Sequence, residues 1–235
     1  MRQKINNTKN VRNFIFKRGL SFLILLLFVA NFYAQKIIEK SLISNASNLI
    51  CEFEIVDEIV IFESISFNEI TVSAESEESN FPNFILEEIN GNIFIKSIEV
   101  KIDPEGDELG KVCKVQPIYT SFKIMIPKGK NVLINYVDGN FYLNNFDGNL
   151  KLNLNDGIVN LNHFLGSVNI HMNGGNVYCT KIQNTKIDIT SNMGIITSSL
   201  HLEDSLEKNN RLKGVYGRKL NELNVNAITA NIYLK

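Results

Sequence analysis

Residues 131–148 read NVLINYVDGNFYLNNFDG, residues 149–166 read NLKLNLNDGIVNLNHFLG, and residues 167–184 read SVNIHMNGGNVYCTKIQN. These segments align without a gap at a period of 18 residues, and residues 185–202 align as a fourth copy after one inserted residue. Asp-Gly or Gly-Gly pairs fall at one place in the first three copies, and Met193-Gly194 takes that place in the fourth. A short fixed period is typical of proteins that stack one small structural unit.

Apolar and polar residues alternate inside each copy. A period of two predicts β-strands that bury one face, and the glycine pairs supply the positive φ angles of sharp turns. An extended unit of this length spans about 60 Å, which suffices for two or three short strands but not for a strand with a covering helix. The side chains that we expect to point inward are Val132, Ile134, Tyr136, Phe141, Leu143, Phe146, Leu150, Leu152, Leu154, Val159, Leu161, Phe164, Val168, Ile170, Met172, Val177, Cys179 and Ile182.

These patterns predict an all-β fold, a single-stranded β-solenoid in which each 18-residue copy is one rung. A single rung cannot bury its apolar face, whereas stacking places equivalent side chains about 4.8 Å apart in continuous inner columns. A meander or sandwich of hairpins would also accommodate Asp-Gly turns. We favour the solenoid because the strands of hairpins do not need to repeat at a constant spacing of 18 residues. The sequence leaves the handedness of the coil open.

The first 34 residues differ from the rest of the chain. They contain six basic residues and no acidic one, and residues 20–30 form the apolar run LSFLILLLFVA. This pattern predicts a secretory signal peptide cleaved after Ala34, because the apolar run is shorter than the roughly 20 residues of a spanning helix. Phe32 fits the cleavage site poorly, so an uncleaved anchor is the alternative. We expect an exported protein of the periplasm, outer cell surface or extracellular space that meets the membrane only through this segment.

The rest of the chain is expected to form one β-solenoid domain. Its predicted parts are an N-terminal cap with degenerate rungs (35–126), regular rungs (127–202), a loop (203–219) and a final rung that covers one end of the stack (220–235).

The charge of residues 35–235 is acidic and uneven. They hold 18 basic and 25 acidic residues, a net charge of −7. Residues 35–110 contain 17 acidic and 4 basic residues, and residues 111–235 contain 8 and 14. The simpler interpretation of this asymmetry is that both charged regions are exposed to solvent. The alternative is end-to-end self-association, in which the acidic region of one copy meets the basic region of another. Nucleic-acid binding is not expected, because five of the basic residues are confined to residues 208–219 rather than interleaved with aromatic residues.

The sequence offers little for catalysis or metal binding. His163, His171 and His201 lack metal-ligand spacing, and stacking of Asp138 on Asp156 would supply too few oxygen ligands for calcium. The outward rows carry Asn, Thr, Tyr and Lys rather than the clustered acids of polysaccharide-cleaving enzymes. We therefore expect no enzyme, metal site or cofactor.

The three cysteines allow one disulfide bridge, between Cys51 and Cys113, and leave at least one cysteine unpaired within a monomer. Cys51 and Cys179 fall at inward positions of their segments and are interpreted as small buried hydrophobic residues.

A candidate binding surface lies on the outward side of the copies. Tyr142 and Tyr178 should share one outward row with Asn160 between them, and a neighbouring row should hold Asn144, Asn162 and Thr180. Aromatic rings beside amide and hydroxyl groups suit the binding of a glycan or a protein surface. Alternatively, Asn and Tyr simply suit exposed strand positions.

The run Phe122-Lys-Ile-Met-Ile-Pro127-Lys-Gly129-Lys-Asn-Val132, followed by DGNFYL and DGNLKL, resembles the bacterial family of putative adhesins. The resemblance covers residues 49–234, departs from the family pattern at Met193 and in residues 203–219, and brings no active-site residues. It implies a β-solenoid on the exported side of a bacterial envelope. We expect a non-enzymatic structural or adhesive role there. The alternative is an envelope regulatory or stress-response accessory that binds a partner protein, and a polysaccharide-active enzyme comes last.

Overall fold

The structure is a computed structural model that describes residues 36–53, 55–76, 83–98, 120–208 and 210–235. All of these residues belong to one compact unit, Lys36–Lys235. The predicted signal peptide and its cleavage point lie outside the described residues, as does Cys113, which the sequence allowed as a disulfide partner of Cys51. Within the described ranges, no helix has the length and apolar character needed to cross a membrane.

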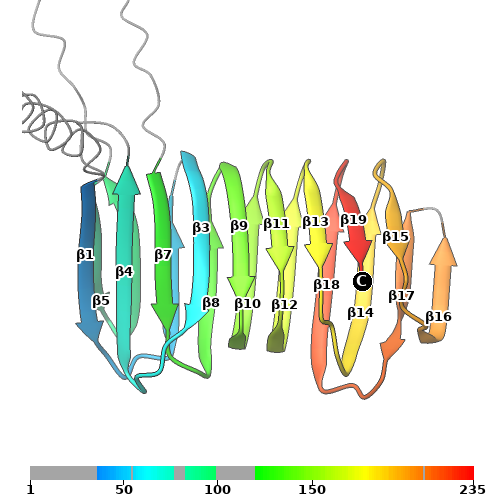
Figure 1. The fold of residues 1–235 in the computed structure, drawn as a ribbon, viewed down its shortest axis with the longest axis horizontal. Coiled ribbons are helices and arrows are strands. Elements are labelled where there is room, and N and C mark those ends of the chain that lie inside the picture. The colour runs from blue at the N-terminus through cyan, green and yellow to red at the C-terminus, as the bar shows by residue number, and fades with distance from the viewer. Residues whose placement is uncertain (1–35, 54, 77–82, 99–119, 209) are drawn as a thin grey trace, which may run out of the picture. The chain divides into compact units, whose positions relative to one another are not determined.

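The described residues form two mixed β-sheets and no helix, which confirms the prediction of an all-β fold (Figure 1). The nine-stranded sheet has the order β1 (Lys36–Ile43), β4 (Glu69–Ser76), β7 (Thr120–Ile126), β3 (Ile55–Glu63), β9 (Asp138–Asn144), β11 (Ile158–Leu161), β13 (Asn176–Cys179), β19 (Asn231–Leu234) and β15 (Ile196–Ser198). The ten-stranded sheet has the order β16 (Glu203–Lys208), β17 (Arg211–Tyr216), β14 (Thr185–Ser191), β18 (Asn221–Ala227), β12 (Phe164–Met172), β10 (Phe146–Leu154), β8 (Lys130–Asn135), β2 (Asn48–Glu52), β6 (Asn92–Ile98) and β5 (Asn83–Ile89).

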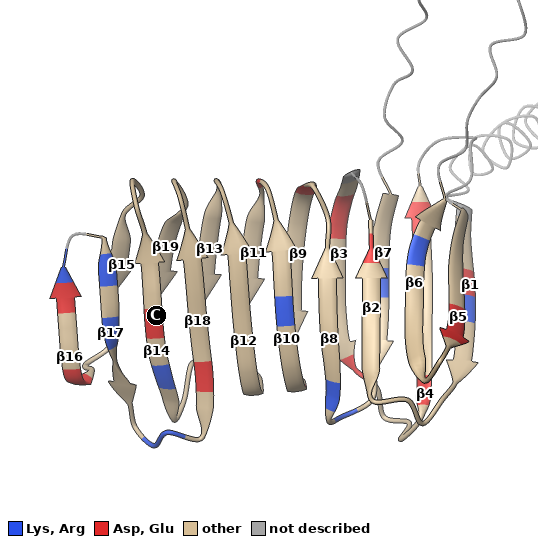
Figure 2. Ribbon diagram, turned by 180° about the vertical axis from the view of Figure 1, so that it is seen from behind, with Lys and Arg blue, Asp and Glu red and all other residues tan. Residues whose placement is uncertain are grey.

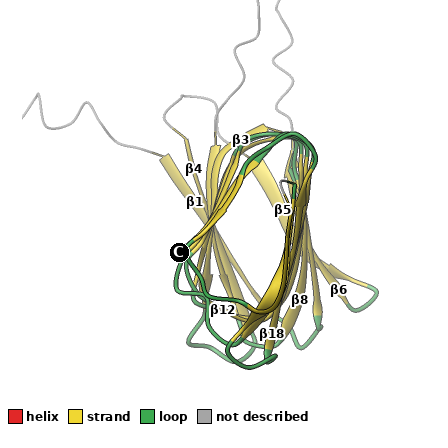
Figure 3. Ribbon diagram, turned by 90° about the vertical axis from the view of Figure 1, so that its right-hand side faces the viewer, coloured by secondary structure: helices red, strands yellow, loops and turns green. Residues whose placement is uncertain are grey.

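The two sheets face each other as in a β-sandwich and enclose one hydrophobic core (Figure 3). Every side chain of the regular copies that was predicted to point inward is buried, with at most 6% of its surface exposed. Cys51 and Cys179 belong to the same core, as their inward positions predicted. Both are free thiols. The period-two pattern therefore identified the buried face of each strand correctly.

The three regular copies each supply strands to both sheets. β8 and β9 come from the first copy, β10 and β11 mainly from the second, and β12 and β13 mainly from the third. Within each sheet these strands are parallel and pair equivalent residues; Leu150, for example, lies opposite Val132 on one side and Val168 on the other. The 18-residue offset read from the sequence is thus the register of this part of both sheets.

Glycine is required at the shared turn by close stacking as well as by backbone angle. Gly157 has a φ of 149°, and a Cβ added there would lie 1.9 Å from the carbonyl oxygen of Gly139. A Cβ on Gly175 would meet the carbonyl oxygen of Gly157 at the same distance. No side chain fits between backbones at this separation. The glycine column therefore lets successive copies approach to sheet spacing at the corner.

The final rung does not lie at an end of the stack, so this part of the prediction was wrong. β18 pairs in parallel with β12 and β14, and β19 pairs in parallel with β13 and β15. In each sheet, one strand from residues 221–234 lies between the third copy and the fourth (Figure 1). The fourth copy is therefore not the direct neighbour of the third. Gly194 of the fourth copy accordingly stacks on Ala230, whose carbonyl oxygen a Cβ on Gly194 would meet at 1.9 Å.

Residues 203–219 do not form the predicted loop but contain an antiparallel pair, β16 and β17. β17 pairs with β14 and buries Leu212 and Val215. The charges and glycines of this segment suggested a loop, but Gly214 takes an inward position where an added Cβ would lie 2.7 Å from the Cβ of Leu202. All six residues of β16 are exposed. A short charged strand of this kind protects a sheet edge from further pairing.

Antiparallel pairs lie at the other end of both sheets, where β1 pairs with β4, β4 with β7, and β5 with β6. Between them and the regular copies, β2 and β3 pair in parallel with β8 and β9. Lys130 at the start of β8 is only 6% exposed, and its Nζ donates hydrogen bonds to the carbonyl oxygens of Ser44 and Ala46, at 3.4 and 2.5 Å. The lysine after the Pro-Lys-Gly corner thus attaches β8 to the chain that leads into β2.

Candidate binding surfaces

The predicted tyrosine row exists on the outward face of the nine-stranded sheet. Asn160 lies opposite Tyr142 on one side and Tyr178 on the other. The row continues to Tyr233, whose ring stacks on that of Tyr178 with a centroid separation of 5.0 Å and an interplanar angle of 10°. Sequence reasoning missed Tyr233 because the final rung was expected at the end of the stack. Its outward position in the alternating pattern of β19 was the available signal.

The predicted neighbouring row is also formed and is internally hydrogen-bonded. Asn162 Nδ2 donates to Asn144 Oδ1 at 3.3 Å, and Thr180 Oγ1 donates to Asn162 Oδ1 at 3.4 Å. The structure therefore brings all six predicted binding residues onto one sheet face. Their role in binding stays a prediction.

Rows of asparagine also cross the outward face of the ten-stranded sheet. Asn131 Nδ2 donates to Asn48 Oδ1 at 3.1 Å, and Asn149 Nδ2 donates to Asn131 Oδ1 at 2.9 Å. Asn48 Nδ2 extends the row to Asn92 Oδ1 at 3.0 Å. Because the strands stack in register, each amide is placed to donate to the same amide of the next strand. Such ladders fix the orientation of the surface amides.

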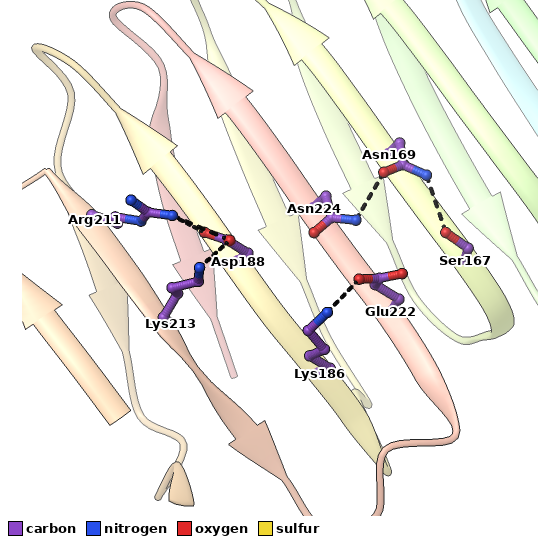
Figure 4. Close-up of polar contacts among 8 residues, drawn as sticks. All are labelled: Ser167, Asn169, Lys186, Asp188, Arg211, Lys213, Glu222 and Asn224. Carbon is purple, nitrogen blue, oxygen red and sulfur yellow. Dashed lines mark hydrogen bonds and ion pairs between the residues drawn. The ribbon is translucent and has the colours of Figure 1, made fainter. Parts of the chain in front are cut away.

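Charged residues are concentrated toward the two ends of the ten-stranded sheet and are few on β10 and β12 (Figure 2). Near one end, Asp188 forms ion pairs with Arg211 at 3.2 Å and with Lys213 at 2.9 Å (Figure 4). Lys186 pairs with Glu222 at 2.9 Å. Partial burial of Asp188 opposes ionisation, but hydrogen bonds from Lys213 and Arg211 and the charges of both outweigh it, so the pKa of Asp188 lies below its ordinary value.

A groove of about 740 Å³ runs along the corner where β2, β8, β10, β12 and β18 end. Its outward row consists of Glu52, Asn135, Asn153, His171 and Asn226. Its other lining residues are Phe53, Tyr136, Val137, Leu154, Asn155, Met172, Asn173 and Ile228. Tyr136 is only 5% exposed, and its hydroxyl has no hydrogen-bond partner among the described residues. Burial raises the pKa of this phenol.

The described residues contain no group of three or more His, Cys, Asp and Glu side chains arranged to hold a metal ion. Asp138 and Asp156 form a parallel bridge at the shared turn, as their equivalent positions predicted, and Asn155 Nδ2 donates to Asp138 Oδ1 at 3.4 Å. Burial raises the pKa of the Cys179 thiol to about 12 and that of Cys51 further. Thiols in such surroundings are poor nucleophiles at neutral pH.

The fold is shared with a solved bacterial structure. A protein described as a putative cell adhesion protein from Clostridium sporogenes superposes with a TM-score of 0.54 at 15% identity, over 86% of this chain and 99% of that chain. A putative adhesin from Bacteroides fragilis matches with a TM-score of 0.30 at 12% identity, over 86% of this chain and 99% of its own. At these identities, the first likeness establishes a common fold only. No sequence-family model and no curated protein sequence matches this chain.

Proposed function

We propose that this chain is an exported, non-enzymatic protein of the putative adhesin class, with a structural or adhesive role at a bacterial cell envelope. Its stacked two-strand turns would be the rungs of a β-solenoid. The observation that carries the proposal is the row Tyr142, Asn160, Tyr178 and Tyr233 on one sheet face. The name of the Clostridium sporogenes structure agrees with an adhesive role, and residues 1–34 have the pattern of a secretory signal.

The tyrosine row suits the contact of a glycan or a protein surface for physical reasons. All four side chains are partly exposed and stand on strands fixed by parallel pairing. The stacked rings of Tyr178 and Tyr233 restrict each other before any ligand arrives. Side chains ordered in advance lose less conformational entropy on binding. Amide and hydroxyl groups of Asn144, Asn162 and Thr180 lie in the neighbouring row and supply hydrogen bonds.

The test is substitution of Tyr142 and Tyr178 by Ala, with circular dichroism and urea unfolding to verify the fold. We expect the double variant to lose binding to cells, glycans or envelope proteins that the parent chain binds. Phe94→Ala is the matched control, because Phe94 is a partly exposed outward aromatic residue of the opposite sheet. Unchanged binding by a folded double variant would exclude the tyrosine row as the adhesive surface.

Location and partner are tested separately. Protease treatment of intact cells should remove a surface-exposed protein while a periplasmic control survives. Full protection would instead favour the envelope regulator, and so would recovery of one stoichiometric envelope protein in a pull-down. Hydrolase or lyase activity on a polysaccharide panel would contradict the non-enzymatic assignment.

A further inference from the structure

We propose that the groove at the ends of β2, β8, β10, β12 and β18 binds a neutral, linear oligosaccharide that lies along the stacking direction of the strands. This site is separate from the tyrosine row, because its lining residues come from the ten-stranded sheet and the turns that leave it. The proposal does not depend on an adhesive role for the tyrosine row.

The length of the groove suits an extended chain molecule. Its outward row crosses five neighbouring strands, which gives four intervals of about 4.8 Å, or about 19 Å in total. Parallel pairing places one polar side chain at each interval, and three of the five are Asn. A linear polymer can therefore make a polar contact at each successive strand, whereas a compact small molecule would use only part of the row.

The polar groups of the groove match hydroxyl groups better than charged groups. Amide side chains predominate, and each amide both donates and accepts hydrogen bonds, as a hydroxyl does. Asn153 Nδ2 donates to Asn135 Oδ1 at 2.7 Å, which fixes both amides and leaves their remaining donors and acceptors for a ligand. Among the described lining residues Glu52 alone is acidic, and it pairs with Lys96 at 3.3 Å. The groove thus selects against a strongly charged ligand.

Apolar side chains add a second kind of contact to the groove. Val137 and Ile228 line the groove and are 45% and 44% exposed, so the carbon–hydrogen faces of a sugar ring can pack on them. Leu154 and Met172 also line the groove but are almost fully buried.

Isothermal titration calorimetry of the full chain with cellotetraose, xylotetraose, mannotetraose and chitotetraose tests the proposal. We expect saturable binding of at least one of these neutral tetrasaccharides and weaker binding of the corresponding disaccharide. His171→Ala and Asn226→Ala, which change exposed outward side chains, should each weaken binding severalfold. Tyr178→Ala, on the opposite sheet, should leave it unchanged. Absence of binding to all four sugars, or loss of binding only in Tyr178→Ala, would overturn the proposal.

Discussion

The rings of Tyr178 and Tyr233 stack with their centroids 5.0 Å apart and their planes 10° from parallel, although 55 positions separate the two residues in the chain. They meet because β19 pairs with β13, the last strand of the third copy. The ring contact therefore exists only because residues 221–234 lie between the third and fourth copies.

A double-mutant cycle of Tyr178→Ala and Tyr233→Ala should give a coupling free energy of about 0.5–1.5 kcal/mol in urea unfolding, because stacked aromatic pairs contribute about that much beyond buried area. Tyr142 and Tyr233 lie in the same row but are separated by β11 and β13. Their cycle serves as the control and should couple by less than about 0.5 kcal/mol. Equal coupling in the two cycles would mean that the ring stack contributes nothing specific.

Hydrogen exchange should reveal that β19 is paired on both sides. Its amides lie between β13 and β15, so we expect them to exchange as slowly as those of β13. The amides of β16, an edge strand whose six residues are all exposed, should exchange much faster. Rapid exchange throughout β19, as in a frayed terminus, would contradict its inserted position.

Gly157→Ala should lower the free energy of unfolding by more than about 2 kcal/mol. The new Cβ would lie 1.9 Å from a backbone oxygen of the neighbouring copy, and the φ of 149° is unfavourable for alanine. Gly129→Ala is the matched control, because Gly129 also has a positive φ, of 74°, but no atom lies within 4 Å of an added Cβ. We expect about 1 kcal/mol there. Similar losses in both variants would show that backbone angle, rather than stacking, sets the glycine requirement.

Asp188→Asn should lower stability at neutral pH by about 1 kcal/mol or less, because the carboxylate pairs with two cations but is 27% exposed. The pKa of Asp188 is lower in the folded chain than its ordinary value of 3.8. The contribution of Asp188 to the free energy of unfolding is therefore complete above pH 3.8 and is lost as the pH falls through the lower pKa of the folded state.

The difference between Asp188→Asn and the parent chain, measured by urea unfolding at several pH values, should shrink in that acidic range. Glu222→Gln, which breaks the more exposed pair with Lys186, is the comparison and should change stability less. If the stability difference between Asp188→Asn and the parent chain stayed constant down to the lowest pH, the carboxylate of Asp188 would not be its cause.

The sequence predicted the inward side chains and the register of the regular copies because both follow from local alternation and a constant period. Leu150 pairs with Val132 and Val168 for this reason. The period does not state which copies are neighbours. Leu223 fits an inward position equally well at the end of the stack or between β12 and β14, and only the folded chain places it in the second setting.

The candidate surfaces were predictable to different extents. The positions of Tyr142, Asn160 and Tyr178 followed from the repeat, but Tyr233 depended on the order of the strands. The groove joins outward residues such as His171 to the inward Tyr136 at the point where the strands turn. Alternation assigns each residue to one face or the other, so a site that uses both faces at a corner lies outside what alternation can predict.

The position of residues 221–234 also makes the fold depend on a contact between distant parts of the chain. Residues 185–198 precede them in the sequence, yet the later segment lies between the earlier one and the third copy. The sheets therefore cannot be completed by adding strands in chain order from β12 to β14. Without β18 and β19, the fourth copy has no strand partner on its inner side, so the last strands of the chain hold it to the regular copies.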